Sequence, residues 1–360
     1  MKELLLCLIS GGVGYFSREI IKLIQQNGGF PLSGSFKLGL GGSSPRESSK
    51  GCLLGAIELG GTTSKAAVSW SSATSEIIAD ITVPTEDPET TLSKLVEFLV
   101  RQESELESEF AALGVGSFGP IDIDPLSESY GCVTSSPKIL WRNFNVRSRV
   151  VDAFPEVPVG FDTDVNAPAL AEIAFGGHGE KVNSAAYITV GTGVGVGVVV
   201  DGRPVHGLMH PEGGHITVEK YPGDTFVSEC LFHGSACELE AMVCAEGIAR
   251  RCGVAPENLK DIPDEDPVWN IIAYYLAALC INITYLISPQ VIVISGGIMK
   301  RTLLYPLIRE HFQRLNAGYV GVNRVMNELD KYIVPSKFGY SIGVIGTLHI
   351  AERELKAAKS

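Results

Sequence analysis

The feature that most limits the possible folds is a pattern of short strands and glycine-rich turns that occurs twice along the chain. Residues 53–59 and 65–70 read as two apolar strands around a Gly-Gly-Thr turn, and residues 184–202 as two strands around a Gly-Thr-Gly turn. A helical pattern and a further strand follow later in each half. The repeat lies in the order of the secondary-structure elements and not in the identities of the residues. It predicts two related α/β domains that face each other across a cleft.

Length and composition agree with two domains and limit the partners. The chain has 360 residues, 45% of them hydrophobic, and a net charge of −12. This charge argues against a nucleic-acid partner, which needs a concentrated basic face, and favours small molecules. Eight cysteines scattered from Cys7 to Cys280 do not resemble a disulfide framework. We therefore expect a reducing, cytoplasmic location.

The first 50 residues differ from the rest. They carry six Lys and Arg against three Glu, a charge of +3, which leaves −15 for the remainder, and they are rich in Ser and Gly. We expect residues 1–51 to be an N-terminal extension, either an organelle transit peptide or an irregular tail. The expected domains are a smaller one at 52–163 plus 342–360 and a larger one at 164–341.

One apolar segment has nearly the length of a membrane span. Residues 271–287 carry no charge over 17 positions, but Asn282 and Thr284 interrupt the segment, and Pro289 and the apolar run at 291–295 follow at once. This order is typical of a core helix that leads into a buried strand. The sequence therefore predicts no membrane partner.

The first glycine turn is a candidate phosphate-binding site. Gly60 and Gly61 allow backbone N–H groups to converge on an anion, and the Thr62 hydroxyl can add a donor. The patterns GxxxxGK[ST] and GxGxxG are absent. A lone Gly-Gly-Thr hairpin is more often only a tight turn. Two further glycine-rich segments favour phosphate binding instead, because a nucleotide held between two domains needs several such turns. They are the turn at Gly191, Thr192 and Gly193 and the strand end at 295–300.

Asp164 follows an apolar strand and opens a helical run, in the segment "GFDTDVNAPALAE". One interpretation is a helix N-cap, for which Asp is favoured. The other is a general base that takes a proton from a substrate hydroxyl. The residues alone leave the two interpretations open.

The segment "HPEGGH" places Glu212 and His215 around two glycines. It is not the HExxH metalloprotease motif, and its glycines argue against the helix which that motif needs. Hydrogen bonding to a polyol is the more natural role.

A cluster of potential metal ligands begins in the same loop. It consists of two histidines and two cysteines within 23 residues, a set that suits tetrahedral zinc with no open position and therefore a structural site. Each of these side chains, taken alone, also fits an ordinary core or surface position. The four are His215, Cys230, His233 and Cys237.

Taken in order, the motifs resemble those of the ROK sugar kinases, and within them the bacterial-type fructokinases, from about residue 53 to 352. The segments that carry the resemblance are "GSFGPID", "YGCVTSSPK", "TDVNAPALAE", "TVGTGVGVGVVVDGRPVHGLMHPEGGH" and "ISGGIM". The resemblance implies an actin-like two-domain ATPase fold. It also implies transfer of the γ-phosphoryl group of ATP, bound with Mg²⁺, to a hexose hydroxyl, with Asp164 as the catalytic base.

The resemblance also implies the binding residues. The first two glycine turns would hold phosphates, with Lys65 near the first. Residues beside the adenosine would be Gly296, Gly297, Ile298, Met299 and Lys300. The sugar site would comprise Gly119, Pro120, Lys138, Glu212, His215 and Glu240. Since His215 is also a predicted zinc ligand, the metal would support the sugar-binding loop.

The sequence departs from the family pattern at three places. Thr63 replaces the lysine that usually follows Gly-Gly-Thr, and Lys65 is two residues further along. Positions 63 and 65 share a strand face, so Lys65 reaches a similar place. The zinc loop has one additional residue before Cys237, and the glutamate that normally follows is either Glu238 or Glu240. The family's Ser-Gly-Pro-Ala loop is "CAEG", with Glu246 in the proline position.

Fructose, converted to fructose 6-phosphate, is the expected substrate. Glucose, mannose or an N-acetylhexosamine is the alternative within the class, and a non-catalytic sugar sensor is the alternative outside it. Repressors of the family carry a helix-turn-helix domain, for which the first 50 residues are too short and too rich in Gly and Ser. The expected partners are ATP, a hexose and, by resemblance, a second copy of the chain in a homodimer.

Overall fold

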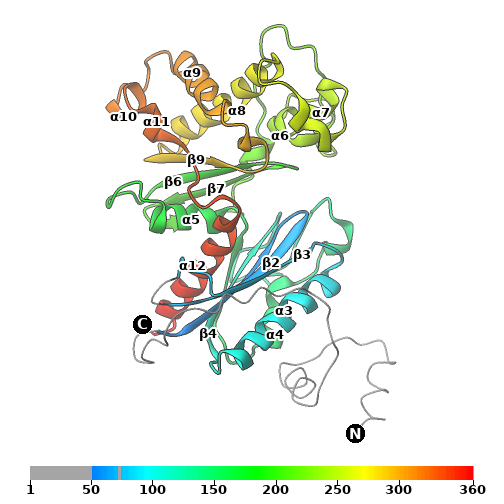
Figure 1. Ribbon diagram of the computed structural model, residues 1–360, viewed down its shortest axis with the longest axis vertical. Coiled ribbons are helices and arrows are strands. Elements are labelled where there is room, and N and C mark those ends of the chain that lie inside the picture. Colours follow the sequence, from blue (N-terminus) through cyan, green and yellow to red (C-terminus); the bar gives the residue numbers. More distant parts are fainter. Residues whose placement is uncertain (1–50, 72–73, 360) are drawn as a thin grey trace. The chain divides into compact units, whose positions relative to one another are not determined.

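The computed structural model describes residues 51–71 and 74–359 (Figure 1). The hypotheses about residues 1–50 lie outside this part of the chain. The described residues form two compact units, the first running up to Phe161 and resuming at Thr347, and the second spanning Asp162–Gly346. The strand β5 (Val159–Thr163) and the helix α12 (Ile342–Ala357) carry the chain from one unit into the other. The two units thus divide at 161/162 and 346/347, whereas the sequence led us to expect domain boundaries at 163/164 and 341/342.

The first unit is built on a five-stranded sheet in the order β3-β2-β1-β4-β5. β1 pairs with β2 in antiparallel and with β4 in parallel orientation. Because parallel strands end at the same edge, the segments after β1 and β4 leave the sheet together, and the Phe118 N–H donates to the Leu59 carbonyl at 2.8 Å. Besides β5, the strands of this sheet are β1 (Leu53–Leu59), β2 (Thr63–Trp70), β3 (Ala79–Pro84) and β4 (Phe110–Ser117).

Helices cover both faces of this sheet, with α3 (Pro88–Glu105) and α4 (Val146–Ala153) on one face and α12 on the other (Figure 1). α3 starts where Asp87 accepts a hydrogen bond from the Thr90 N–H and Pro88 opens the first turn. Its buried side chains recur at helical spacing, at Leu92, Leu95, Val96, Leu99 and Val100, and belong to the core of this unit. α12 approaches closely, because a Cβ at Gly114 of β4 would come 2.0 Å from the Thr347 carbonyl oxygen.

The second unit repeats this plan with a sheet in the order β10-β9-β6-β7-β8. β6 pairs antiparallel with β7 and parallel with β9, in the same pattern as β1, β2 and β4. The architectural repeat predicted from the sequence is therefore present in the strands. They are β6 (Ala185–Val190), β7 (Val194–Val200), β8 (Arg203–Pro204), β9 (Val291–Ser295) and β10 (Ile333–Pro335).

In the second unit, α5 (Asn166–Phe175) packs on one face of the sheet and the other helices on the opposite face (Figure 1). The main core lies beneath α8 and α9, where apolar side chains of β6, β7 and β9 meet both helices. The helices of that face are α6 (Leu239–Val243), α7 (Ala245–Cys252), α8 (Val268–Leu286), α9 (Leu304–Asn316), α10 (Asn323–Met326) and α11 (Leu329–Tyr332).

α8 contains the long apolar segment noted in the sequence. Within the described residues it alone is long and apolar enough to cross a membrane, judged by length and composition. In the structure, however, 78% of that segment is buried inside the protein, and β9 follows it. α8 therefore has the surroundings of a core helix.

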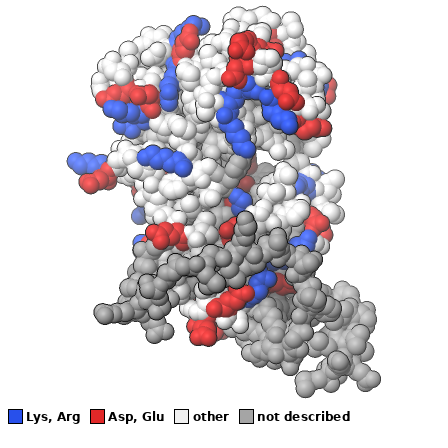
Figure 2. All heavy atoms as spheres, in the orientation of Figure 1, with Lys and Arg blue, Asp and Glu red and all other residues white. Residues whose placement is uncertain are grey.

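Charged side chains of both signs lie near one another on the visible face (Figure 2). The ion pairs of the second unit include Arg250 with Glu229 at 3.0 Å and Arg301 with Asp264. Arg301 also lies over the Trp269 ring, with 4.1 Å between the guanidinium carbon and the ring centroid. Paired charges of this kind occupy a solvated surface and contribute little to stability individually.

Candidate functional site

Two of the three glycine-rich turns lie side by side at one edge of the second sheet. β6 and β9 are parallel, and Thr189 at the end of β6 pairs with Ser295 at the end of β9. The chain continues from β6 into Gly191–Gly193 and from β9 into Gly296. Gly296 has a φ of +103°, and a Cβ there would come 2.3 Å from the Val190 carbonyl oxygen, so a side chain does not fit. The structure thus brings together two of the turns predicted to bind the nucleotide.

The residues after Gly296 differ in their surroundings. Gly297 and Lys300 are exposed, Ile298 is half-buried, and Met299 is 4% exposed and belongs to the core. These residues form the short 3₁₀ helix Ile298–Lys300. The geometry gives Met299 a packing role, while the glycines and Lys300 offer surface to a ligand.

The Gly191–Gly193 turn is held by segments far away in the sequence. Within the turn, the Gly191 N–H donates to the Gly193 carbonyl at 2.9 Å. The Ala245 N–H, at the start of α7, donates to the Gly191 carbonyl at 2.8 Å. The Val194 N–H donates to Oε2 of Glu240, on α6, at 2.7 Å. Thr192, at the tip, is exposed.

The first turn, Gly60–Thr62, joins β1 and β2 in the first unit. The Gly60 N–H donates to the Thr63 carbonyl at 3.2 Å, and a Cβ on Gly60 would come 2.6 Å from that oxygen. Gly61 and Thr62 are exposed. Thr85, just after β3, donates from its N–H to the Thr62 carbonyl at 3.0 Å and from its hydroxyl to the Gly60 carbonyl at 2.8 Å.

Lys65 lies on β2 directly opposite Glu58 of β1. Its Nζ is 3.9 Å from Oε2 of Glu58, and both side chains are mostly buried. Burial raises the pKa of Glu58, and the nearby Lys65 ammonium opposes that shift. Lys65 is three residues beyond Thr62, the last residue of the turn, and it lies near a carboxylate of the same hairpin.

The sugar-site residues predicted in the first unit also meet at one place. Gly119 and Pro120 follow β4 and are joined by a cis peptide bond. The Pro120 carbonyl accepts a hydrogen bond from the Thr134 N–H at 2.7 Å. The Lys138 ammonium lies 5.7 Å from the centroid of the Phe118 ring, next to Gly119. Since β1 and β4 end at the same edge, this group and the first glycine turn share that edge.

Asp164 follows β5 directly and is half-buried. The alternative role as the N-cap of α5 is not observed, because α5 begins at Asn166 after Val165 and no side chain caps it at that position. The Thr163 hydroxyl instead accepts the hydrogen bond from the Asn166 N–H, at 2.9 Å.

Asp162 organises the backbone around Asp164, and sequence reasoning missed it. The carboxylate is 4% exposed and accepts hydrogen bonds from the Thr163 N–H at 2.7 Å and from Nδ2 of Asn166 at 2.8 Å. Its other oxygen is 3.0 Å from Nε2 of His206. This hydrogen bond is the main cause that raises the pKa of His206, while burial opposes it. The alternation D-T-D was the available signal, because residues two apart share a strand face.

The loop that carries Glu212 and His215 packs against β7 through its two glycines. A Cβ on Gly214 would come 2.0 Å from the Val194 carbonyl oxygen, and a Cβ on Gly213 would come 2.9 Å from the Val196 side chain. Glu212 is exposed, and one of its oxygens is 3.5 Å from Nδ1 of the buried His210. The glycines of "HPEGGH" thus allow the loop to approach β7, the strand that follows the Gly191–Gly193 turn.

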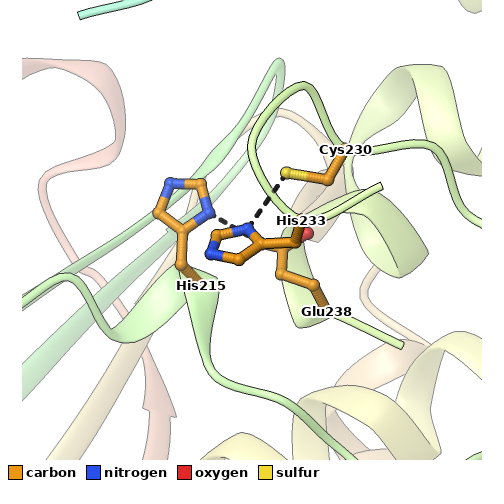
Figure 3. A group of neighbouring side chains, drawn as sticks. All are labelled: His215, Cys230, His233 and Glu238. Atoms are coloured by element: carbon orange, nitrogen blue, oxygen red, sulfur yellow. Dashed lines mark hydrogen bonds and ion pairs between the residues drawn. The ribbon is translucent and has the colours of Figure 1, made fainter. Parts of the chain in front are cut away.

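A group of potential metal ligands surrounds His215 (Figure 3). Ligand atoms of His215, Cys230, His233 and Glu238 all lie within 4.8 Å of one another. Nδ1 of His215 is 2.7 Å from Oε1 of Glu238, and Sγ of Cys230 is 3.2 Å from Nδ1 of His233. Two imidazoles, one thiol and one carboxylate are donors that zinc accepts in tetrahedral sites. The donor set therefore fits the expected metal.

The fourth member of this group is Glu238, whereas the sequence predicted Cys237. The Cys237 thiol faces Tyr275, and burial is the main cause that raises its pKa. Tyr275 in turn donates a hydrogen bond to Asp224 at 2.6 Å.

Glu238 and Glu240, which the sequence left as alternatives, have different contacts. Glu238 is buried, contacts His215 and accepts the Ala241 N–H at 2.9 Å, so it also caps α6. These contacts lower the pKa of Glu238 against the raising effect of burial. Glu240 contacts the Gly191–Val194 turn, and burial raises its pKa.

The segment "CAEG" forms the start of α7. The Cys244 thiol accepts a hydrogen bond from the Gly247 N–H at 3.4 Å and thereby caps the helix. Glu246 is exposed in the first turn. Acidic residues are favoured at this end of a helix, which accounts for a glutamate in the position expected for proline.

Comparisons with known proteins give matches over most of the chain. A model of the ROK family matches residues 54–354. The putative fructokinase of Bacillus subtilis is 36% identical over 307 residues, covering 85% of this chain and 97% of that protein. The fructokinase of Pediococcus pentosaceus is 36% identical over 306 residues, covering 85% and 100%. The crystal structure of the ROK hexokinase from Thermus thermophilus aligns with a TM-score of 0.66 at 25% identity, covering 85% and 99%. These matches confirm the predicted fold class.

Proposed function

The chain belongs to the ROK family, and we propose that it is an ATP-dependent hexose kinase that converts fructose to fructose 6-phosphate. Curated fructokinases share 32–36% of its residues over more than four fifths of its length. Glucose, mannose and N-acetylhexosamines are the alternative sugars, because the motifs define the phosphoryl transfer more closely than they define the sugar.

The observation that carries the proposal is the position of Asp164. It is half-buried at the end of β5, the backbone around it is fixed by Asp162, and Thr163 has taken over the capping of α5. A carboxylate placed in this way can accept the proton of a sugar hydroxyl as the hydroxyl attacks the γ-phosphorus. We assign the catalytic base to Asp164.

The remaining predicted residues take binding roles. The turns Gly60–Thr62 and Gly191–Gly193 would hold the phosphates through backbone N–H groups other than those of Gly60 and Gly191, which donate within the turns. Lys65 would lie beside the first turn, and Gly296–Lys300 would lie near the adenosine. Gly119, Pro120, Lys138, Glu212 and His215 would bind the sugar. MgATP is the substrate form of the nucleotide, and its metal neutralises charge that develops during transfer. Alignment and charge neutralisation are the main requirements of this reaction.

The test is ADP release by the purified protein across a panel of hexoses, with Asp164→Asn as the comparison. Loss of a general base typically costs about 10²–10⁴ in turnover. We expect fructose-dependent turnover in the wild type and a loss of this size in the variant, with fructose still bound. Turnover that survives in the variant contradicts the role of Asp164. Sugar binding without any turnover in the wild type favours the sensor.

We further propose that His215, Cys230, His233 and Glu238 hold a structural zinc ion. Zinc there would fix the loop of Glu212 and His215, and the exchange of a thiolate for a carboxylate distinguishes this site from the set predicted by sequence. Bound zinc would place a divalent charge at residues that otherwise pair with one another.

This ligand assignment is tested by the metal content after mild chelation. Cys237→Ala should retain zinc as the wild type does, and Glu238→Gln, which keeps an oxygen to cap α6, should lose it. Cobalt substitution gives a second readout, since the thiolate absorption of the cobalt protein should disappear in Cys230→Ala and persist in Cys237→Ala. The reverse result for Cys237 would restore the original set.

A cytoplasmic location and a homodimer complete the proposal, with no nucleic-acid or membrane partner. The matched relatives are sugar kinases over nearly their whole length, and α8 has the surroundings of a core helix. Sedimentation of the purified protein tests the homodimer directly.

A further inference from the structure

The alternation of glycines in β7 continues beyond the Gly191–Gly193 turn, and the proposed phosphate site does not use the two that follow. A Cβ on Gly197 would come 2.0 Å from the Val165 carbonyl oxygen, and a Cβ on Gly195 would come 2.6 Å from Cγ1 of Val165. Neither glycine has a positive φ, so close packing accounts for the missing side chains. Val165 directly follows Asp164. β7 is therefore shaped to receive the segment that carries the proposed base.

The side chain of Asn166, the first residue of α5, fastens this segment to β7. It is fully buried. Its Oδ1 accepts the Val198 N–H of β7 at 3.1 Å, and its Nδ2 donates to Oδ1 of Asp162 at 2.8 Å. Only this orientation of the amide fits, because a backbone N–H needs an acceptor as its partner. One amide thus bridges the end of β5, just before Asp164, and the strand that follows the Gly191–Gly193 turn.

The hairpin of β7 and β8 makes room for this bridge. After the two residues of β8, the Val205 N–H donates to the Val198 carbonyl at 2.9 Å, but the Val198 N–H is bonded to Asn166. The next residue, His206, places Nε2 3.0 Å from the second oxygen of Asp162. The hairpin is therefore bonded to the base segment on both sides of Asp164, at Asp162 and at Asn166.

We propose that Asn166 is a positioning residue for the base Asp164. Its amide fixes the base segment against β7, so that the base and the Gly191–Gly193 turn are carried by one rigid element of the second unit. This inference rests on the proposed function, because it takes Asp164 to be the base and the turn to hold phosphate. Phosphoryl transfer depends mainly on alignment, so a displaced base lowers turnover without weakening the binding of either substrate.

The test compares Asn166→Ala with a matched control, Asn316→Ala. Asn316 is also buried, and its Oδ1 accepts the Val320 N–H at 2.9 Å, but it ends α9, on the face of the second sheet opposite α5. Both variants should lower Tm, because each loses a buried amide with its hydrogen bonds. Only Asn166→Ala should lower kcat, by about 10–100-fold, with KM for ATP and for fructose nearly unchanged.

A double-mutant cycle with Asp164→Asn shows whether Asn166 acts through the base. Once the carboxylate of Asp164 is gone, Asn166→Ala has no base to displace and should lower kcat further by less than about threefold. If Asn166→Ala does not fold, Asn166→Asp takes its place, because it keeps an acceptor for the Val198 N–H and lacks the donor to Asp162.

An equal loss of kcat in the wild-type and Asp164→Asn backgrounds would overturn the inference, since it would show a defect that does not pass through the base. An unchanged kcat in Asn166→Ala, or a loss matched by Asn316→Ala, would overturn it as well. Failure of the proposed function looks different, because the wild type itself would then show no hexose-dependent turnover, and the inference would fall with it.

Discussion

The two hairpin turns Gly60–Thr62 and Gly191–Gly193 have similar sequences and equivalent places in their sheets, but they are held in different ways. The first is braced by Thr85, which follows the neighbouring strand β3. The second is braced by α6 and α7, through Glu240 and Ala245. The first turn therefore depends on its own sheet, while the second depends on helices that also carry the proposed metal loop. If the Gly191–Gly193 turn binds the nucleotide as proposed, a change in the metal loop can reach the nucleotide through these helices.

The largest difference between the two turns is expected in the change of Tm when a glycine in or against each turn is replaced by alanine. Gly214→Ala would place a Cβ 2.0 Å from the Val194 carbonyl oxygen, whereas a Cβ at Gly61 would have no neighbour within 4 Å. Overpacking of this kind costs about 1–3 kcal/mol, and each kcal/mol lowers Tm by about 2–4 °C in a unit of this size. We expect Gly214→Ala to lower Tm by about 3–10 °C and Gly61→Ala to leave it nearly unchanged, as measured by scanning calorimetry. Equal shifts would show that the second turn is no more constrained than the first.

A smaller effect, on KM for ATP, is expected from Thr85, which forms hydrogen bonds to the first turn. Thr85→Val keeps the shape and the N–H bond to Thr62 but removes the hydroxyl that donates to the Gly60 carbonyl and contacts the Ser64 hydroxyl at 2.7 Å. A lost hydrogen bond costs about 1 kcal/mol, so KM for ATP should rise about fivefold in steady-state kinetics. Thr85→Ser retains the hydroxyl and serves as the control. Metal removal should leave this turn unaffected, and an effect of chelation on the Thr85→Val defect would contradict the separation of the two turns.

Lys65 gives the first turn a nearby cation, and the effect of removing it should be smaller still. If the ammonium reaches the phosphates as proposed, Lys65→Ala should raise KM for ATP about threefold at low salt, and the effect should shrink as salt screens the charge. Lys65→Arg keeps the charge and should remain near the wild type. Kinetics that do not change in Lys65→Ala would limit Lys65 to its pairing with Glu58.

The sequence predicted the elements of both turns but not what holds them. Alternating apolar residues and glycines are local signals, so β1, β2, β6, β7 and the turns between them could be placed by inspection. Thr85 is 25 residues from Gly60, and Glu240 is 46 residues from Val194. Contacts between residues so far apart depend on how the elements pack, and they produce no periodic pattern in the sequence. The same limitation applies to the metal cluster, because spacing alone favoured Cys237, whereas the ligand atoms that lie within 4.8 Å of one another include one of Glu238.

The smallest expected effect concerns pH and compares two histidine–carboxylate pairs, one in each unit. In the second unit, the hydrogen bond to Asp162 raises the pKa of His206 above its ordinary value of 6.5, so the pair adds stability that is fully present below pH 6.5 and is lost as the pH rises through the raised value. In the first unit, the hydrogen bond from His349 lowers the pKa of Glu352 to about 2, so that pair adds stability above pH 4.5 which is lost only as the pH falls towards 2.

His206→Gln should therefore lower Tm at pH 6 more than at pH 8, while Glu352→Gln should lower it equally at both values. Melting curves of the two variants and the wild type at pH 6 and pH 8 measure this difference. Because His206 is partly exposed, the effect should be modest. A His206→Gln defect that is constant with pH would mean that the imidazole acts only as a neutral hydrogen-bond partner of Asp162. In that case the backbone around Asp164 would be fixed equally at both pH values, and turnover of the variant should show the same lack of pH dependence.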